Sequence, residues 1–323
     1  MATSEPTATP VAFHVQATRA LRELLDGCLR GIGQVMFQEH RRSGLLFLIA
    51  VGWTSPLHGG GLVAGTLAGT LAAQAFGAER AALRAGIFGF NGGLVGVGLL
   101  CFLPATIWTW LLVLLAATAA SVLTAALRRG LRHHDLPPLT APFVVATLVA
   151  LLAAAHWARW PSDPSLAAGT PDGATNAIDA TGLALGGEAV LNGLAQVFFQ
   201  KGLVAGALIA IGLLVASLRT GALAISGSAL GMLAGAALGA SKADLAAGLY
   251  GYNAALVAVA LGSVFAAPGR AWLGYTGLGV LLTPLASAAV TVVLTPWGLP
   301  ALTLPFVLVT WLLMLAEKGF RRS

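Results

Sequence analysis

Charged side chains are scarce in this chain of 323 residues. Asp, Glu, Lys and Arg make up only 9% of it, against about 25% in a soluble domain, whereas hydrophobic residues make up 57%. Apolar stretches of about 20 residues, long enough to cross a bilayer as helices, recur along the sequence. The composition therefore excludes an ordinary soluble domain and predicts an all-α polytopic membrane protein.

Cysteine and the common catalytic motifs are also nearly absent. Cys28 and Cys101 are the two cysteines, and because neither has CxxC or metal-binding spacing, we expect small buried hydrophobic side chains. The sequence has no P-loop, no HExxH and no GxSxG motif, so we expect no enzyme, no cofactor and no metal. No carboxylate falls in the middle of an apolar stretch, which argues against a carrier coupled to protons or sodium.

What the chain does contain is an internal duplication. Three blocks recur in order: Gly31–Gln38 as Gly193–Gln200, Phe88–Asn91 as Tyr250–Asn253, and Leu139–Phe143 as Leu302–Phe306. The offset in numbering is the same for the first two blocks (193 − 31 = 162 and 250 − 88 = 162) and one greater for the third (302 − 139 = 163). Duplicated membrane halves are typical of transporters and channels, whose sites lie where the halves meet.

Each half contains five predicted transmembrane spans. They lie near 43–56, 59–76, 81–103, 105–128 and 139–158, and near 203–218, 222–239, 244–262, 271–293 and 299–316. Because five is odd, the second half should be inverted relative to the first. We therefore predict a disordered N-terminal tail (1–13), a first membrane repeat (14–158), an extracytoplasmic linker (159–180), a second, inverted repeat (181–317) and a cytoplasmic tail (318–323).

Basic residues set the orientation. With the N-terminus in the cytoplasm, 15 of the 18 lysines and arginines fall on the cytoplasmic side, and only Arg159, Lys201 and Lys242 fall on the other. This obeys the positive-inside rule. It predicts a multi-pass protein of the cell membrane with both termini cytoplasmic. The same scattering of basic residues over many loops argues against a nucleic-acid partner.

The first repeated block predicts polar groups inside the membrane. It precedes the first clear span of each half, so we expect a short pore helix that enters the protein without crossing, tolerated only where it is buried or lines a wet cavity. Gln34 and Gln196 occupy the same position in the two copies. Their amides could merely join helices, but the repetition favours side chains that line a pathway.

The second block places aromatic rings beside polar residues. Phe90 and Tyr252 precede Asn91 and Asn253, just as Phe37 and Phe199 follow the two repeated glutamines. Rings in membrane helices usually serve packing or lipid contact, but flat rings next to hydrogen-bonding groups also form a slot for a flat polar solute. One turn further along, Leu94 and Leu256 share the helical face of Phe90 and Tyr252.

The third block begins the last span of each half. A proline in a helix lacks the N–H that bonds the carbonyl four residues back, so if the helix extends that far, the carbonyls of Pro138 and Ala301 should lack that partner. Thr140 and Thr303 each supply a hydroxyl. The alternative is a simple helix start with a threonine cap.

Glycines form a further repeated stripe. Gly61, Gly65 and Gly69 recur as Gly227, Gly231 and Gly235 or Gly239. Small residues at every fourth position let membrane helices approach closely, so we interpret this stripe as packing and not as chemistry.

Taken together, the doubled blocks resemble the urea transporter family, including its bacterial channels, over about residues 20–317. The resemblance implies two inverted halves of five transmembrane helices and a pore helix each, one pore per subunit and a homotrimer. It also implies passive permeation of urea through a filter of oxygen ladders and phenyl slots. The filter residues implied are Gln34, Val35, Phe37, Phe90, Leu94, Thr140, Gln196, Val197, Phe199, Tyr252, Leu256 and Thr303. Two positions depart from the family: some relatives carry Glu in place of Gln196, and Tyr252 replaces a Phe.

The residues agree with such a permeant on chemical grounds. Urea is small, neutral, flat and rich in N–H groups, so its pore needs acceptors at the edge and apolar plates on the faces, without net charge. Each hydrogen bond that offsets its desolvation is worth about 1 kcal/mol net, and several weak sites permit passage without trapping. A channel for another small amide or ammonia is the alternative. A membrane-embedded lipid enzyme would need a nucleophile–base pair or a metal cluster, and we find neither in the sequence.

Overall fold

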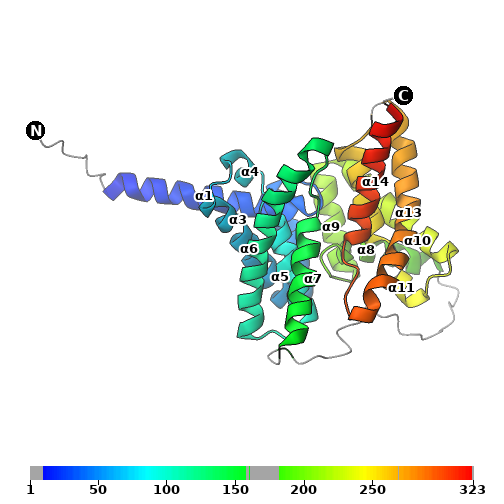
Figure 1. Cartoon of the computed structure of the whole chain (residues 1–323), viewed down its shortest axis with the longest axis horizontal. Coiled ribbons are helices and arrows are strands. Elements are labelled where there is room, and N and C mark those ends of the chain that lie inside the picture. The colour runs from blue at the N-terminus through cyan, green and yellow to red at the C-terminus, as the bar shows by residue number, and fades with distance from the viewer. Residues whose placement is uncertain (1–9, 158–159, 161–181, 268, 322–323) are drawn as a thin grey trace, which may run out of the picture.

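The computed structural model describes residues 10–157, 160, 182–267 and 269–321, and these residues contain helices and no strand. The first half comprises α1 (Pro10–Gln34), α2 (Arg41–Thr54), α3 (Pro56–Ala75), α4 (Arg80–Arg84), α5 (Phe90–Phe102), α6 (Ile107–Gly130), the 3₁₀ turn η1 (Leu131–His134) and α7 (Ala141–His156). The second half comprises α8 (Gly182–Gln196), α9 (Leu203–Ala216), α10 (Leu218–Ala237), α11 (Lys242–Ala246), α12 (Tyr252–Val259), the π-helical turn η2 (Ala260–Val264), α13 (Ala271–Leu294), the 3₁₀ turn η3 (Thr295–Trp297) and α14 (Leu304–Arg321). Figure 1 shows the two halves side by side, with α1 extending outward from the bundle.

The elements of the two halves correspond in order, and four pairs of helices are equal in length. Helices α2 and α9 have 14 residues each, α3 and α10 have 20, α4 and α11 have 5, and α6 and α13 have 24. Their junctions correspond as well, since Ser55 caps α3 and Ser217 caps α10, each accepting a backbone N–H at 3.2 Å. The duplication seen in the sequence is thus also a duplication of local structure.

Unusual backbone conformations recur in the same way. Phe37 and Phe199 have φ of 61° and 58°, and Leu139 and Leu302 have φ of 52° and 50°. This left-handed region is uncommon for residues other than glycine. All four residues lie in the repeated blocks, so the blocks preserve two sharp turns in each half.

Length and hydropathy identify this as a helical membrane protein. Among the described residues, the segments Ile107–His134, Leu218–Ala237 and Ala271–Trp297 are long and apolar enough to cross a bilayer. Phe90–Phe102, Ala141–His156, Leu203–Ala216 and Tyr252–Val264 are shorter apolar helices. Large apolar side chains lie exposed on the outside, for example Val292 at 72% and Leu218 at 75%, as expected where a surface faces lipid instead of water.

The third predicted span of each half is not a continuous helix. Residues 81–103 divide into α4 and α5, and residues 244–262 into α11 and α12 with part of η2. Gly86 and Gly248 lie at the breaks, with φ of 76° and 79°. A Cβ atom on either glycine would collide with the backbone of Gly31 or Gly193. The break therefore lets the chain pass directly against the ends of α1 and α8.

The predicted glycine stripes do serve packing. A methyl group on Gly65 would collide with the carbonyl of Gly92, and one on Gly61 with the carbonyl of Gly96, so α3 and α5 lie almost backbone to backbone. Gly231 approaches the carbonyl of Tyr250 in the same manner. Gly239 is the exception, because it lies in open space with φ of 86° at the turn after α10.

The two halves are joined through α2 and α9. The Ser43 hydroxyl donates to the carbonyl of Gly212 at 2.6 Å, and the Phe47 and Phe198 rings lie 5.4 Å apart. Ser43, Phe47 and Phe198 are fully buried. The core is therefore continuous across the junction of the halves.

The predicted domain limits fall partly outside the described residues. This applies to most of the N-terminal tail and of the linker at 159–180. Helix α1 begins at Pro10, before the predicted start of the first repeat, and α14 continues to Arg321, beyond the predicted end of the second.

Candidate permeation site

Two helices end inside the protein at the repeated glutamines. Helix α1 ends at Gln34 and α8 at Gln196, and each is followed by a turn with a left-handed phenylalanine. Since α1 has 25 residues and α8 has 15, the expectation of a short helix does not hold for α1. The last carbonyls of both helices accept N–H groups of the turns that follow, that of Gln34 from Phe37 at 2.9 Å and that of Gln196 from Phe199 at 3.0 Å, so the acceptors that remain for a solute at these ends are those of the glutamine side chains.

The second glutamine of each block clamps its turn. The Gln38 amide donates to the Met36 carbonyl at 2.8 Å, and the Gln200 amide donates to the Phe198 carbonyl at 2.7 Å. Both glutamines are buried. The sequence singled out Gln34 and Gln196 but missed this role of their neighbours.

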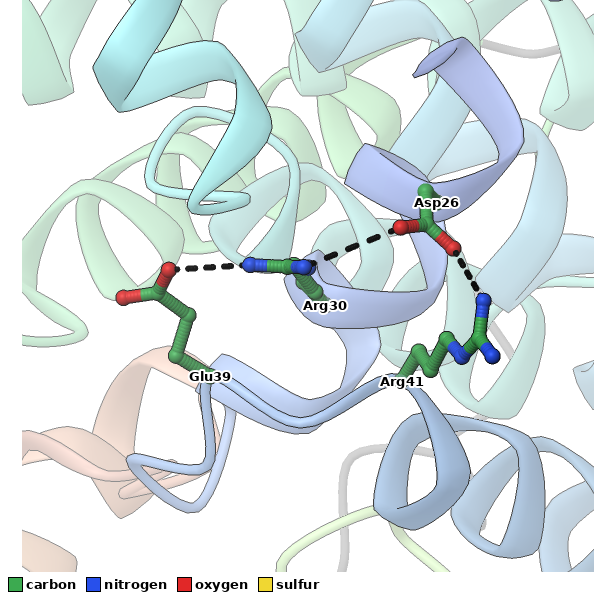
Figure 2. A network of polar contacts seen from close by, with 4 residues as sticks. All are labelled: Asp26, Arg30, Glu39 and Arg41. Atoms are coloured by element: carbon green, nitrogen blue, oxygen red, sulfur yellow. Dashed lines mark hydrogen bonds and ion pairs between the residues drawn. The ribbon is translucent and has the colours of Figure 1, made fainter. Parts of the chain in front are cut away.

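A chain of ion pairs braces the first turn from outside (Figure 2). Arg30 pairs with Glu39 at 3.2 Å and with Asp26 at 3.7 Å, and Asp26 pairs with Arg41 at 3.5 Å. These side chains are 35–62% exposed, so each pair contributes about 0–1 kcal/mol. Their effect is mainly geometric, because they join α1 to the start of α2 across the turn that carries Phe37.

Asn91 and Asn253 hold the turns before α7 and α14. The Asn91 amide donates to the Leu139 carbonyl at 3.4 Å and to the Thr124 hydroxyl at 3.2 Å, while its oxygen accepts the Phe143 N–H at 3.2 Å. The Asn253 amide donates to the Leu302 carbonyl at 3.3 Å. Each asparagine thereby fixes the left-handed leucine beside a repeated threonine.

Those threonines meet at the junction of the halves. The hydroxyls of Thr140 and Thr303 lie 2.6 Å apart, and both residues are 3% exposed. Thr140 makes no side-chain capping bond to α7, so a simple cap does not describe it. The carbonyls of Pro138 and Ala301 accept an N–H from three residues on, that of Ala141 at 3.1 Å and that of Leu304 at 3.2 Å, in place of the proline N–H four residues on that does not exist.

A cavity of about 490 Å³ leads toward this pair from one side. We call it the first-half cavity. It is lined by Gln34, Val35, Phe37, Ile87, Phe90, Arg128, Arg132, Asp135, Leu136, Pro137, Pro138, Leu139, Thr140, Val264 and Phe265. Five of the predicted site residues are among them. The Gln34 amide nitrogen donates to the Ala85 carbonyl at 3.0 Å, which leaves the amide oxygen as an acceptor.

Aromatic rings form two matched clusters, each built from both halves. Phe37 meets Phe265 and Phe306 edge to face, both at 6.0 Å. Phe199 meets Phe102 at 5.8 Å and Phe143 at 6.0 Å in the same manner. Phe102 and Phe265 were missed, although they are separated by the same offset as Thr140 and Thr303 and could have been found by it.

The remaining predicted residues lie away from the first-half cavity. Leu94, Val197 and Leu256 are buried in the core, and Gln196 and Tyr252 are half-buried. The Tyr252 hydroxyl donates to the Leu302 carbonyl at 2.5 Å, so it points to a polar partner within the protein. No group of three or more His, Cys, Asp or Glu side chains that could hold a metal occurs among the described residues.

A family model described as "Urea transporter" matches residues 25–318 of this chain. The chain belongs to the urea transporter family. It is 31% identical to Urea transporter 1 of Capra hircus over 302 residues, which cover 91% of this chain and 77% of that protein. It is 29% identical to Urea transporter 1 of Rattus norvegicus over 300 residues, with the same coverage. Members of this family are transporters and not enzymes, and the chain is accordingly a helical membrane protein of a transporter family.

Proposed function

We propose that the chain is a passive, channel-like path for urea through the first-half cavity and past the Thr140–Thr303 pair. The observation that carries the proposal is this pair of hydroxyls, buried where the two halves meet and lying at the end of a cavity with rings on its walls. Family membership supports urea as the permeant.

Each part of the site has a role suited to urea. Gln34 and Gln196 accept the N–H groups of urea at the two ends of the filter. Thr140 and Thr303 do so in the middle, flanked by Val35 and Val197. Phe37, Phe90, Phe199 and Tyr252 bound the flat faces of the solute, with Leu94 and Leu256 behind them. Because each contact is weak and repeated, the solute moves from one to the next.

The matched elements support an inverted arrangement of the two halves around one pore in each subunit. In that arrangement both termini are cytoplasmic, the first-half cavity opens to the cytoplasm, and the subunits form a homotrimer. Exposed apolar side chains over the outer helices suit both lipid contact and contact between subunits.

Proteoliposomes provide the test. Vesicles that contain the protein should shrink and re-swell in urea much faster than empty vesicles, with the same rate in the presence and absence of proton or sodium gradients. Accumulation of urea driven by such a gradient would contradict a passive path. Parallel measurements with formamide, thiourea and ammonia distinguish a urea path from one for another small amide or for ammonia.

A further inference from the structure

Two arginines lie at the exposed end of the first-half cavity. Arg128 belongs to the last turn of α6 and Arg132 to η1, and both are exposed, whereas Thr140 at the other end of the cavity is buried. The Arg128 guanidinium lies over the Phe88 ring, 5.7 Å from its centroid. A solute that enters through this cavity therefore passes both guanidinium groups before it reaches the filter.

The positive charge at this mouth is largely uncompensated. Asp135 is the one carboxylate among the lining residues, and it already pairs with Lys318 at 3.0 Å. Neither Arg128 nor Arg132 forms an ion pair within the described part of the chain. The electrostatic field at the entrance is therefore set mainly by the two positive charges of Arg128 and Arg132.

The corresponding positions of the second half carry no charge. At the offset that relates Thr140 to Thr303, Arg128 corresponds to Thr291 and Arg132 to Thr295. The local backbone is equivalent, because η1 and η3 are both 3₁₀ turns and each is followed by a left-handed residue, Asp135 or Gly298. The two halves thus have the same backbone here but different side chains, so the fold does not require arginine at either position.

A neutral filter made of acceptors and ring faces does not by itself reject flat cations. Guanidinium has nearly the shape of urea, carries more N–H donors, and is attracted to carbonyl oxygens and aromatic faces. Discrimination against such an isostere needs a repulsive element. We propose that Arg128 and Arg132 are this element, an electrostatic barrier that excludes guanidinium-like cations while neutral urea passes. The proposal rests on the proposed function, because it assumes that the first-half cavity is an entrance to the urea path.

The expected effect follows from Coulomb's law. For an assumed separation of about 8 Å between the solute and each of two unit charges, Coulomb's law in a water-like dielectric lowers the local concentration of a univalent cation about fivefold. Salt weakens the effect, since the screening length is about 8 Å at 0.15 M and about 30 Å at 0.01 M. The measurement therefore belongs at low ionic strength.

Tracer exchange of guanidinium in proteoliposomes tests the barrier. Equal guanidinium concentrations inside and outside avoid net charge movement, and every ion must cross both mouths, so the orientation of the protein does not matter. The test variant is Arg128→Thr/Arg132→Thr, which copies the side chains of the other half. The matched controls are Arg128→Lys/Arg132→Lys, which keeps the charge, and Arg129→Thr, which removes an exposed neighbouring charge that does not line the cavity.

We expect the ratio of guanidinium to urea permeability to rise about fivefold in the double Thr variant, to stay at the wild-type value in the double Lys variant, and to rise clearly less in Arg129→Thr, whose charge lies outside the lining of the cavity. The rise should largely disappear at about 0.15 M salt. An unchanged ratio in a double Thr variant that still passes urea would overturn the barrier and leave the urea path standing. If wild-type vesicles pass urea no faster than empty ones, the proposed function fails, and the barrier fails with it.

Discussion

Replacing Thr140 by valine keeps the shape of the side chain and removes one of the two hydroxyls that meet at the junction of the halves. In the wild type these hydroxyls bond each other at 2.6 Å, and both residues are only 3% exposed. The variant leaves the Thr303 hydroxyl buried without this partner, at a cost of about 1–3 kcal/mol in the free energy of unfolding. The reverse substitution, Thr303→Val, should cost a similar amount.

The double variant separates stability from transport. Thr140→Val/Thr303→Val removes both hydroxyls, and an apolar pair of the same shape can be nearly neutral, so the double variant should be more stable than either single variant. Urea permeability, in contrast, should be lower in the double variant than in either single variant. If each hydroxyl supplies one hydrogen bond of about 1 kcal/mol at the narrowest step, permeability falls about fivefold in each single variant and about thirtyfold in the double variant.

Stopped-flow light scattering measures urea and water permeability in the same vesicles, and thermal unfolding in detergent measures stability. Thr147→Val and Thr310→Val are the matched controls. Both residues lie on the helices that begin directly after the test pair, correspond to each other in the two halves, are fully buried, and have hydroxyls without a hydrogen-bond partner. Removing these hydroxyls should leave urea permeability unchanged and should not reduce stability. Wild-type urea flux in both single Thr140 and Thr303 variants would refute the assignment of the pair to the permeation path.

Three further substitutions probe the walls and the supports of the path. Phe37→Leu should lower urea permeability several-fold and leave water permeability nearly unchanged, because a flat solute needs a flat wall; equal losses of both would indicate a general collapse. Tyr252→Phe removes the bond to the Leu302 carbonyl and should lower stability by about 1 kcal/mol, measured by thermal unfolding, with urea flux changed by less than about twofold. Asn91→Ala leaves the Phe143 N–H buried and unpaired and should destabilise by on the order of 3 kcal/mol; an unchanged unfolding temperature would show that the clamp is unimportant.

The duplication in the sequence predicted more of this molecule than its hydropathy did. Repeated residues pointed to Thr140 and Thr303, and the structure brings their hydroxyls into contact although they lie in different halves of the chain. Hydropathy treated residues 81–103 as one span, since it is insensitive to the glycine at 86, where the chain turns with φ of 76°. The turn allows Gly86 to pack against α1, which is distant in the sequence. Such a contact does not alter the pattern of apolar residues, so hydropathy cannot predict it.

The aromatic clusters show a second limit to what can be predicted from the sequence. Phe37 and Phe199 were identified from their blocks, but their partners depend on how the halves interlock, which no local pattern encodes. Rings of one half face rings of the other, so Phe37 meets Phe265 and Phe199 meets Phe102. Tertiary contacts of this kind can be inferred from a duplicated sequence only when both copies are aligned along their whole length.

A change in the offset between the two halves explains why Phe102 and Phe265 were not recognised as corresponding residues from the sequence. The offset is one greater at Phe265 (265 − 102 = 163) than at Tyr252 (252 − 90 = 162), so one extra residue enters the second half between them. The π-helical turn η2 lies in that interval, and π-helical turns accommodate an inserted residue within a helix. With this insertion the offset becomes 163, and at that offset Phe102 corresponds to Phe265 and Thr140 to Thr303. Arg128 and Arg132 correspond at the same offset to the uncharged Thr291 and Thr295. The ring clusters and the threonine pair therefore follow one correspondence between the halves, whereas Arg128 and Arg132 have uncharged counterparts in it.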